Sequence, residues 1–300
     1  MKIILLITIV LFNYINAIEF GTLATGSKNG MYYKMGKDIC NLFSNYGINI
    51  KPIVTGGSYD NLSILDGHYI KNQNTFFAIV QKDAIAYYNY IQYTKHNRTI
   101  FNKIPAVISL GIEQIHILAN IDSDFDFDRR KTYKVFCGDR DSGTCITTKY
   151  IEKAYNFKFI YVNSKESTVL TKLKEGMVDL VFKVVEKPNN FFKNLEDVKF
   201  IDFPTNFTME DMYIHSEITK EDYPWIEENI HAFAVSKVLV TNLYEKKYAP
   251  VLANIANILT LNKTYMERTY GNYWKNVDFR YTNFRKMSRA SRKVILTNLK

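Results

Sequence analysis

The chain has 300 residues, of which 47% are apolar, and it carries a formal net charge of +9. This length suits two domains or one large domain with an ample core, and the apolar content excludes an intrinsically disordered chain. There are three cysteines, but no Cys-x-x-Cys and no His-x-x-x-His occurs. The sequence therefore offers no metal site of standard spacing, and we expect neither a metal nor a cofactor.

The first seventeen residues have the pattern of a secretory signal peptide. Lys2 supplies the positive start, residues 3–12 the apolar core, and Ile15-Asn16-Ala17 a small-residue cleavage site. The alternative, an uncleaved membrane anchor, needs about 20 apolar residues, and this run is nearer half that. We therefore expect a periplasmic protein that is cleaved after Ala17.

A turn rich in glycine and hydroxyl groups follows the strand-like run 18–23. It reads Ala24-Thr25-Gly26-Ser27-Lys28-Asn29-Gly30-Met31-Tyr32-Tyr33 and leads into helical spacing over residues 32–43. Free backbone N–H groups at a helix start favour an anion. We expect ligand contacts from Ser27, Asn29, Gly30 and Tyr32. The alternative is an ordinary strand-to-helix turn in which Ser27 only caps the helix.

A second turn of the same kind, Thr55-Gly56-Gly57-Ser58, follows a short strand over residues 50–54 and opens a helix over 58–65. Two glycines before a capping serine predict several donors that point outward. We expect ligand contacts from Thr55, Gly57, Ser58 and Asn61, with Asn61 also bracing the loop.

The next strand, residues 76–80, is followed by two polar side chains. Gln81 is a candidate ligand contact because ligands gather at the carboxyl ends of strands in α/β folds, whereas Asp83 is expected to cap a helix over 83–93. Alternating strands and helices up to this point predict a parallel sheet with helices on its faces. Residues 106–121 then form two apolar stretches with a break at 111–114.

A second α/β unit contains the third turn, Cys137-Gly138-Asp139-Arg140-Asp141-Ser142-Gly143-Thr144, between a strand over 133–136 and a helix over 142–155. Ser142, Gly143 and Thr144 offer N–H groups and hydroxyls, and Arg140 could clamp a carboxylate. Alternatively, Arg140 pairs with Asp139 or Asp141 at the surface. Lys183, in an apolar strand over 178–185, is either a ligand contact or a surface lysine.

The cysteines Cys137 and Cys145 bracket this turn. In an oxidising compartment they could close a small disulfide; the alternative is two semi-buried thiols. Further strands are predicted at 159–162, 199–203 and 230–241, and further helices at 167–175 and 248–261.

The pattern predicts an α/β protein of two lobes. The chain is expected to cross into a second domain near Asp122 and to return near Ile214, so that residues 18–121 and 214–300 form lobe 1 and residues 122–213 form lobe 2. Two crossings make a hinge, and a small carboxylate-bearing ligand is expected between the lobes.

The motifs together resemble those of the TAXI-type solute-binding proteins of tripartite ATP-independent periplasmic (TRAP) transporters. The resemblance rests on the first two turns, on Ile79-Val80-Gln81-Lys82-Asp83, on Gly138 with Ser142-Gly143-Thr144, on Gly176-Met177-Val178-Asp179 and on the run 232–241. It implies a type II periplasmic-binding fold that delivers a glutamate-like amino acid or a dicarboxylate to a membrane permease. The chain departs from the family at Val185-Glu186-Lys187-Pro188, where the family tends to have glycines, and in its cysteine pair.

Two other functions are compatible with this pattern. The lobes could report ligand occupancy to a membrane histidine kinase, or the chain could be an exported enzyme. The enzyme hypothesis is the weakest, because neither a nucleophile elbow nor a phosphate-binding loop is present. Six basic residues and no acidic residue lie between 285 and 300. We expect a solvated helix face, or a surface for a partner or anionic lipid, rather than nucleic-acid binding. We also expect a monomer.

Overall fold

A computed structural model describes residues 21–68, 74–125, 128–203, 207–279 and 288–298. The predicted signal peptide lies outside the described residues, and within them no helix combines the length and apolarity that a membrane crossing requires. The chain divides into two compact units. Unit 1 contains residues 1–80, 88–111 and 238–300, and unit 2 contains residues 81–87 and 112–237.

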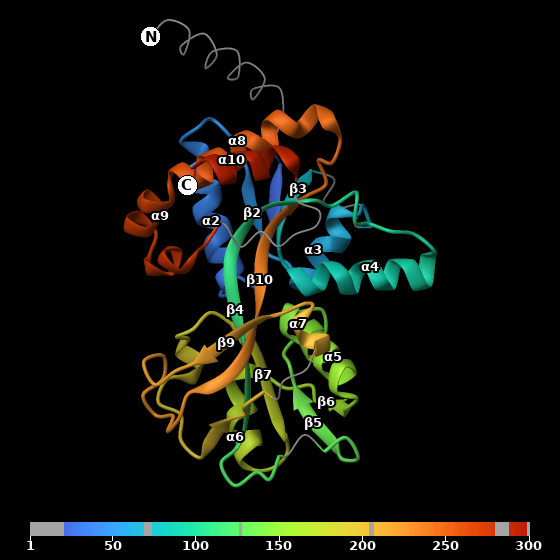
Figure 1. The fold of residues 1–300 in the computed structure, drawn as a ribbon, viewed down its shortest axis with the longest axis vertical. Coiled ribbons are helices and arrows are strands. Elements are labelled where there is room, and N and C mark those ends of the chain that lie inside the picture. Colours follow the sequence, from blue (N-terminus) through green and yellow to red (C-terminus); the bar gives the residue numbers. More distant parts are fainter. Residues whose placement is uncertain (1–20, 69–73, 126–127, 204–206, 280–287, 299–300) are drawn as a thin grey trace, which may run out of the picture. The chain divides into compact units, whose positions relative to one another are not determined.

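Unit 1 is built on parallel strands with helices packed against them (Figure 1). The strand β1 (Thr22–Ala24) pairs in parallel with β2 (Lys51–Ile53) and with β3 (Thr75–Gln81), as the alternation of strands and helices predicts. The helices α2 (Met31–Ser44) and α3 (Ser58–Leu65) connect these strands. The helix α4 (Lys82–His96) follows β3 and supplies residues to both units.

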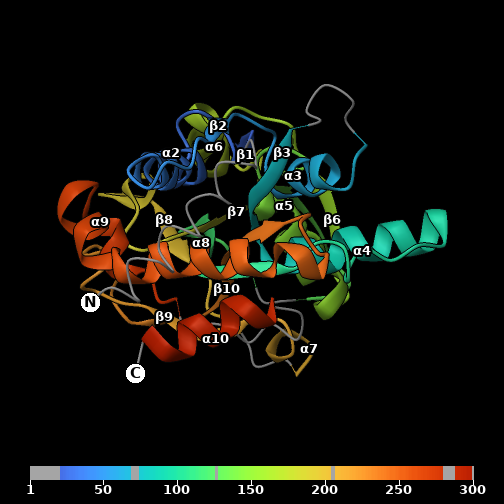
Figure 2. The same cartoon turned by 90° about the horizontal axis from the view of Figure 1, so that it is seen from above.

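The core of unit 1 forms because α2 and the C-terminal helices each bury one apolar face. The buried α2 residues Met35, Ile39 and Phe43 recur at helical spacing. The helix α8 (Ala249–Leu261) lies beside α10 (Arg289–Asn298), which Figure 2 shows from above. The helix α9 (Lys263–Thr269) and the 3₁₀ turns η3 (Lys246–Tyr248) and η4 (Asn272–Asn276) complete this part of the chain.

Unit 2 combines a parallel strand set with an antiparallel one. The strand β5 (Thr132–Phe136) pairs in parallel with β6 (Lys158–Tyr161) and β7 (Leu180–Val185). The helices α5 (Gly143–Tyr155) and α6 (Glu166–Lys174) connect these strands. After the 3₁₀ turn η2 (Asn190–Phe192), β8 (Val198–Phe200) pairs with β4 (Ala106–Asn120), and, after α7 (Phe207–Glu210), β9 (Ile214–Ile218) pairs with β10 (Ile230–Thr241).

The apolar pattern of residues 106–121 is interrupted at 111–114, yet β4 is one continuous strand of 15 residues. Gly111 adopts a φ of 99°, which a glycine tolerates inside a strand without ending it. From Gln114 to Leu118 the strand pairs in register with β7, and Glu113 and Gln114 are buried although they are polar. The strand pairing, which is not visible in the local sequence, keeps the polar segment extended.

Candidate functional site

The first turn is held in shape by its own backbone. The N–H of Gly30 donates to the carbonyl of Ser27 at 2.8 Å, and Gly30 is the N-cap residue of α2. A Cβ at Gly30 would lie 2.9 Å from Ser27 Oγ and 3.2 Å from the Ser27 carbonyl oxygen, so Gly30 and Ser27 are closely packed in the turn. Ser27 and Asn29 are exposed and Tyr32 is half-buried. No side chain caps α2, so the alternative in which Ser27 only caps the helix is wrong.

The second turn differs from the expectation in two ways. Gly57, not Ser58, occupies the N-cap position, because its φ of 120° lets the chain enter α3 one residue earlier. Two of the donors expected to point outward are used within the turn: the N–H of Gly56 donates to Asp60 Oδ2 at 2.9 Å, and that of Gly57 donates to Thr55 Oγ1 at 3.3 Å. The carboxylate of Asp60 thus occupies the position at this helix start where a bound anion would be favoured.

Asn61 ties three segments of unit 1 together. Its Nδ2 donates to the carbonyls of Thr25 and Ile79, at 2.6 and 2.8 Å, and its Oδ1 accepts from Thr55 Oγ1 at 2.6 Å. The side chain is fully buried, so these bonds are made in an environment where an unmade bond is costly. The predicted bracing of the second turn is confirmed, and ligand contact by Asn61, Thr55, Gly57 or Ser58 stays a prediction.

In unit 2 the third turn opens a long helix whose cap is well defined. Ser142 is the N-cap of α5 and its Oγ accepts from the N–H of Cys145 at 3.2 Å. Thr144 Oγ1 accepts from the N–H of Val184 at 3.1 Å, so the helix start is joined to the end of β7. The structure also links Cys137 to Cys145 by a disulfide, which closes the loop around the turn.

Gln81 packs directly on this helix start. A Cβ at Gly143 would lie only 1.7 Å from Gln81 Oε1, so the amide occupies the space that any other residue at position 143 would fill. Gln81 is buried, and its Nε2 lies 3.4 Å from Glu113 Oε2. The structure therefore brings together two predicted site residues, Gln81 and Gly143, that are separated by 61 intervening positions in the sequence.

Sequence reasoning missed a buried lysine in unit 2. Lys237 lies in β10, is fully buried and pairs with the carboxylate of Glu186, which follows β7. Burial lowers the pKa of Lys237 to about 8, and the nearby Glu113 carboxylate opposes that shift. The available signal was the single charged residue inside the otherwise uncharged run 231–241.

Asp83 is also buried, in a polar cluster of its own. Because α4 begins at Lys82, Asp83 lies in the first turn and not at the predicted capping position. Its Oδ2 accepts from Thr147 Oγ1 at 2.6 Å and from the Tyr213 hydroxyl at 2.9 Å. Burial raises the pKa of Asp83 to about 6, although both hydrogen bonds act in the opposite direction.

The two predicted cationic contacts have different surroundings. Arg140 is exposed, two residues before the α5 cap, and its carbonyl accepts from Lys149 Nζ at 3.4 Å. The Lys183 side chain is 14% exposed; its Nζ lies 2.7 Å from Glu166 Oε1 and 4.2 Å from the centre of the Phe191 ring. Ligand contact by either residue stays a prediction.

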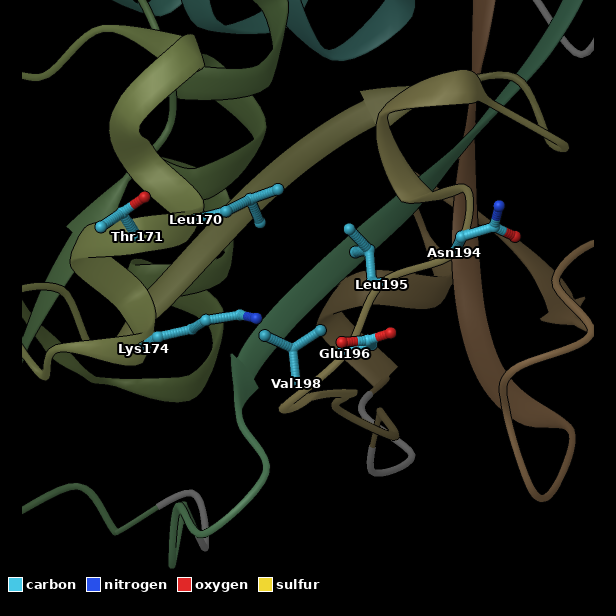
Figure 3. Close-up of a pocket in the computed structure, with 7 residues that line it drawn as sticks. All are labelled: Leu170, Thr171, Lys174, Asn194, Leu195, Glu196 and Val198. Atoms are coloured by element: carbon cyan, nitrogen blue, oxygen red, sulfur yellow. The ribbon is translucent and has the colours of Figure 1, made fainter.

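A pocket of about 370 Å³ lies elsewhere in unit 2 and contains none of the predicted site residues. It lies between α6 and the segment before β8, and Figure 3 shows the Lys174 side chain pointing toward Val198. Its lining residues are Leu170, Thr171, Lys174, Asn194, Leu195, Glu196 and Val198.

Among the residues that the structure describes, no group of three or more His, Cys, Asp or Glu side chains could hold a metal ion.

Comparison with known proteins agrees with this architecture. A family model described as the NMT1-like family matches residues 23–245, and a search of curated proteins found no match. A solved structure described as a periplasmic transporter is similar with a TM-score of 0.51 at 8% identity, covering 93% of this chain and 92% of that one.

The periplasmic binding protein BugD is similar with a TM-score of 0.50 at 10% identity, covering 93% of each chain. A TctC solute-binding protein from Polaromonas has a TM-score of 0.46 at 12% identity, covering 93% of this chain and 94% of that one. At these identities the first two likenesses show the fold, which is the α/β fold of periplasmic binding proteins.

Proposed function

Because the chain belongs to the NMT1-like family, we propose that it is an extracytoplasmic solute-binding protein that captures a small organic acid or amino acid. The fold shared with BugD supports this proposal, since it is the fold of a periplasmic binding protein. We further propose that the protein delivers its solute to the membrane permease of a TRAP transporter. This second step rests on the resemblance of the sequence motifs.

The observation that carries the proposed ligand class is the start of α5. A helix of 13 residues presents its positive end beside Gln81, and an arginine lies two residues before the cap. A helix N-terminus stabilises an anion by about 0.3–1 kcal/mol, or about 2 kcal/mol when partly buried, and a guanidinium adds a bidentate partner for a carboxylate. These groups suit the binding of a carboxylate, and such binding involves no chemical reaction.

The first experiment is a thermal-shift screen of protein that has been refolded to remove any bound solute. The panel contains glutamate, glutamine, other amino acids, keto acids and dicarboxylates. A solute at a hundred times its Kd should stabilise the protein by about 2.7 kcal/mol, which gives a rise of several degrees in Tm. A flat response across the panel would contradict the proposed solute class.

The site itself is tested with a matched pair of arginine variants in unit 2. We expect Arg140→Ala to weaken binding of the identified solute by about tenfold or more, because a charge-assisted bond contributes about 1.5–3 kcal/mol. Arg129→Ala removes the same charge from another exposed position in unit 2 and should leave the Kd unchanged. Equal Kd values for the two variants, measured by calorimetry, would reject the carboxylate clamp.

A further inference from the structure

Two histidines share one face of the antiparallel ladder formed by β9 and β10. In the register of this ladder, His215 lies opposite Phe233 and His231 lies opposite Glu217. Residues two apart on a strand and residues opposite each other project to the same face. The two imidazoles are therefore diagonal neighbours, with ring centres 5.2 Å apart, and the His215 side chain is 53% exposed.

One nitrogen of each ring is held by an acceptor outside the pair. His231 Nδ1 lies 2.8 Å from the carbonyl of Phe203, and His215 Nε2 lies 3.2 Å from Glu210 Oε1. A carbonyl and an ionised carboxylate can only accept, so both of these ring nitrogens carry a proton and donate. The remaining two nitrogens, His215 Nδ1 and His231 Nε2, face each other at 3.0 Å.

Histidines bound to a metal have outer partners of the same two kinds. A ligating imidazole donates its other N–H to a carboxylate or a backbone carbonyl, which fixes the ring and raises the basicity of the ligating nitrogen. Here one histidine has each kind of partner. The 3.0 Å separation also fits the two nitrogens to one ion, since bonds of about 2.05 Å at a right angle place two ligands about 2.9 Å apart.

We propose that His215 and His231 form a two-imidazole site for a divalent transition metal, with Glu210 as a positioning residue. A tetrahedral ion would need the nitrogens about 3.3 Å apart, whereas a tetragonal ion with nitrogen and oxygen ligands, such as Cu(II) or Ni(II), accepts the separation observed. Water completes the coordination at this exposed site. Glu217, opposite His231, adds negative charge on the same face.

Metal binding at this pair displaces a proton. In the metal-free pair, His215 Nδ1 and His231 Nε2 share one hydrogen bond at 3.0 Å. The metal takes the lone pairs of both facing nitrogens, and the proton of their hydrogen bond passes to solvent.

The test is calorimetric titration of the full chain with Cu(II), using glycine as a weak competing chelator. The expected result is one Cu(II) per chain, with nitrogen hyperfine structure from two imidazoles in the electron paramagnetic resonance spectrum. His215→Ala and His231→Ala should each weaken binding at least tenfold. His96→Ala removes an exposed histidine from α4 in unit 1 and should leave the affinity unchanged.

A fourth variant separates positioning from ligation. Glu210→Gln should weaken binding by about tenfold while the two-imidazole spectrum persists, because the carboxylate orients His215 and does not touch the metal. Circular dichroism of each variant verifies folding. The proposal would be overturned if either histidine variant bound Cu(II) as tightly as the unaltered protein. A spectrum without two imidazole nitrogens would overturn it as well.

Discussion

At the residue scale, Asp83 shows how burial sets a side chain's chemistry. The native state raises the pKa of this carboxyl from 3.8 to about 6, because burial disfavours the charged form more than the Thr147 and Tyr213 hydroxyls favour it. The native state therefore holds this proton more tightly than the unfolded chain does. Protonated Asp83 therefore makes its full contribution to the free energy of unfolding below about pH 4, and this contribution is lost as the pH rises through about 6.

We expect Asp83→Asn to remove this dependence, since an amide oxygen can still accept both hydroxyl bonds but does not ionise. The free energy of unfolding of the variant, relative to that of the unaltered protein, should rise by about 2–3 kcal/mol between pH 4 and pH 7. Urea denaturation at several pH values measures the difference, in which all other titrating groups cancel. Parallel stability curves for the two proteins would contradict this assignment.

At the scale of elements, the disulfide between Cys137 and Cys145 joins the end of β5 to the first turn of α5. The two cysteines are eight positions apart, and for a loop of this length the chain-entropy model gives a stabilisation of about 2.5 kcal/mol. The loop also carries Ser142 and Gly143, so the bond restricts the helix start that packs against Gln81.

Denatured, unreduced protein should have one reactive thiol, that of Cys40, which is buried in the native core of unit 1. A colorimetric thiol assay with and without prior reduction gives the count. Three thiols before reduction would contradict the disulfide. The double variant Cys137→Ser/Cys145→Ser should lower the free energy of unfolding by about 2.5 kcal/mol.

At the scale of the whole molecule, the basic C-terminal segment includes the helix α10, which belongs to unit 1. The helix α10 packs on α8, where Ser291 Oγ donates to the carbonyl of Leu252 at 3.2 Å, and Ile295 is buried. Arg292 and Lys293 are exposed on the same helix. This part of the tail is therefore a packed helix with a basic outer face.

Export with cleavage after Ala17 predicts a mature protein that starts at Ile18. Intact-mass measurement of protein recovered from the periplasm of a Gram-negative expression host should show the loss of residues 1–17. Replacing two apolar residues of the signal core with charged ones, Leu5→Lys and Ile7→Lys, should keep the full-length chain inside the cell. Recovery of periplasmic protein that still begins at Met1 would refute cleavage at this position.

The α/β class and most of the elements can be predicted from the sequence, because they depend on local periodicity. The predicted helix over 58–65 matches α3, and the predicted strand over 230–241 matches β10. The glycine-rich turns at helix starts can also be predicted from the sequence, since glycine and hydroxyl residues favour the local backbone geometry of such turns. The continuity of β4 cannot be predicted in this way, because its polar centre stays extended through pairing with β7, more than sixty residues away.

The contacts of the polar groups, in contrast, depend on the tertiary structure. It placed Gln81 against Gly143, turned the donors of Gly56 and Gly57 onto their own loop, and paired the buried Lys237 with Glu186. It also placed a ring nitrogen of His215 3.0 Å from a ring nitrogen of His231 on the neighbouring strand. A side chain's partners, burial and pKa depend on which distant segments pack beside it, and those neighbours cannot be predicted from the local sequence.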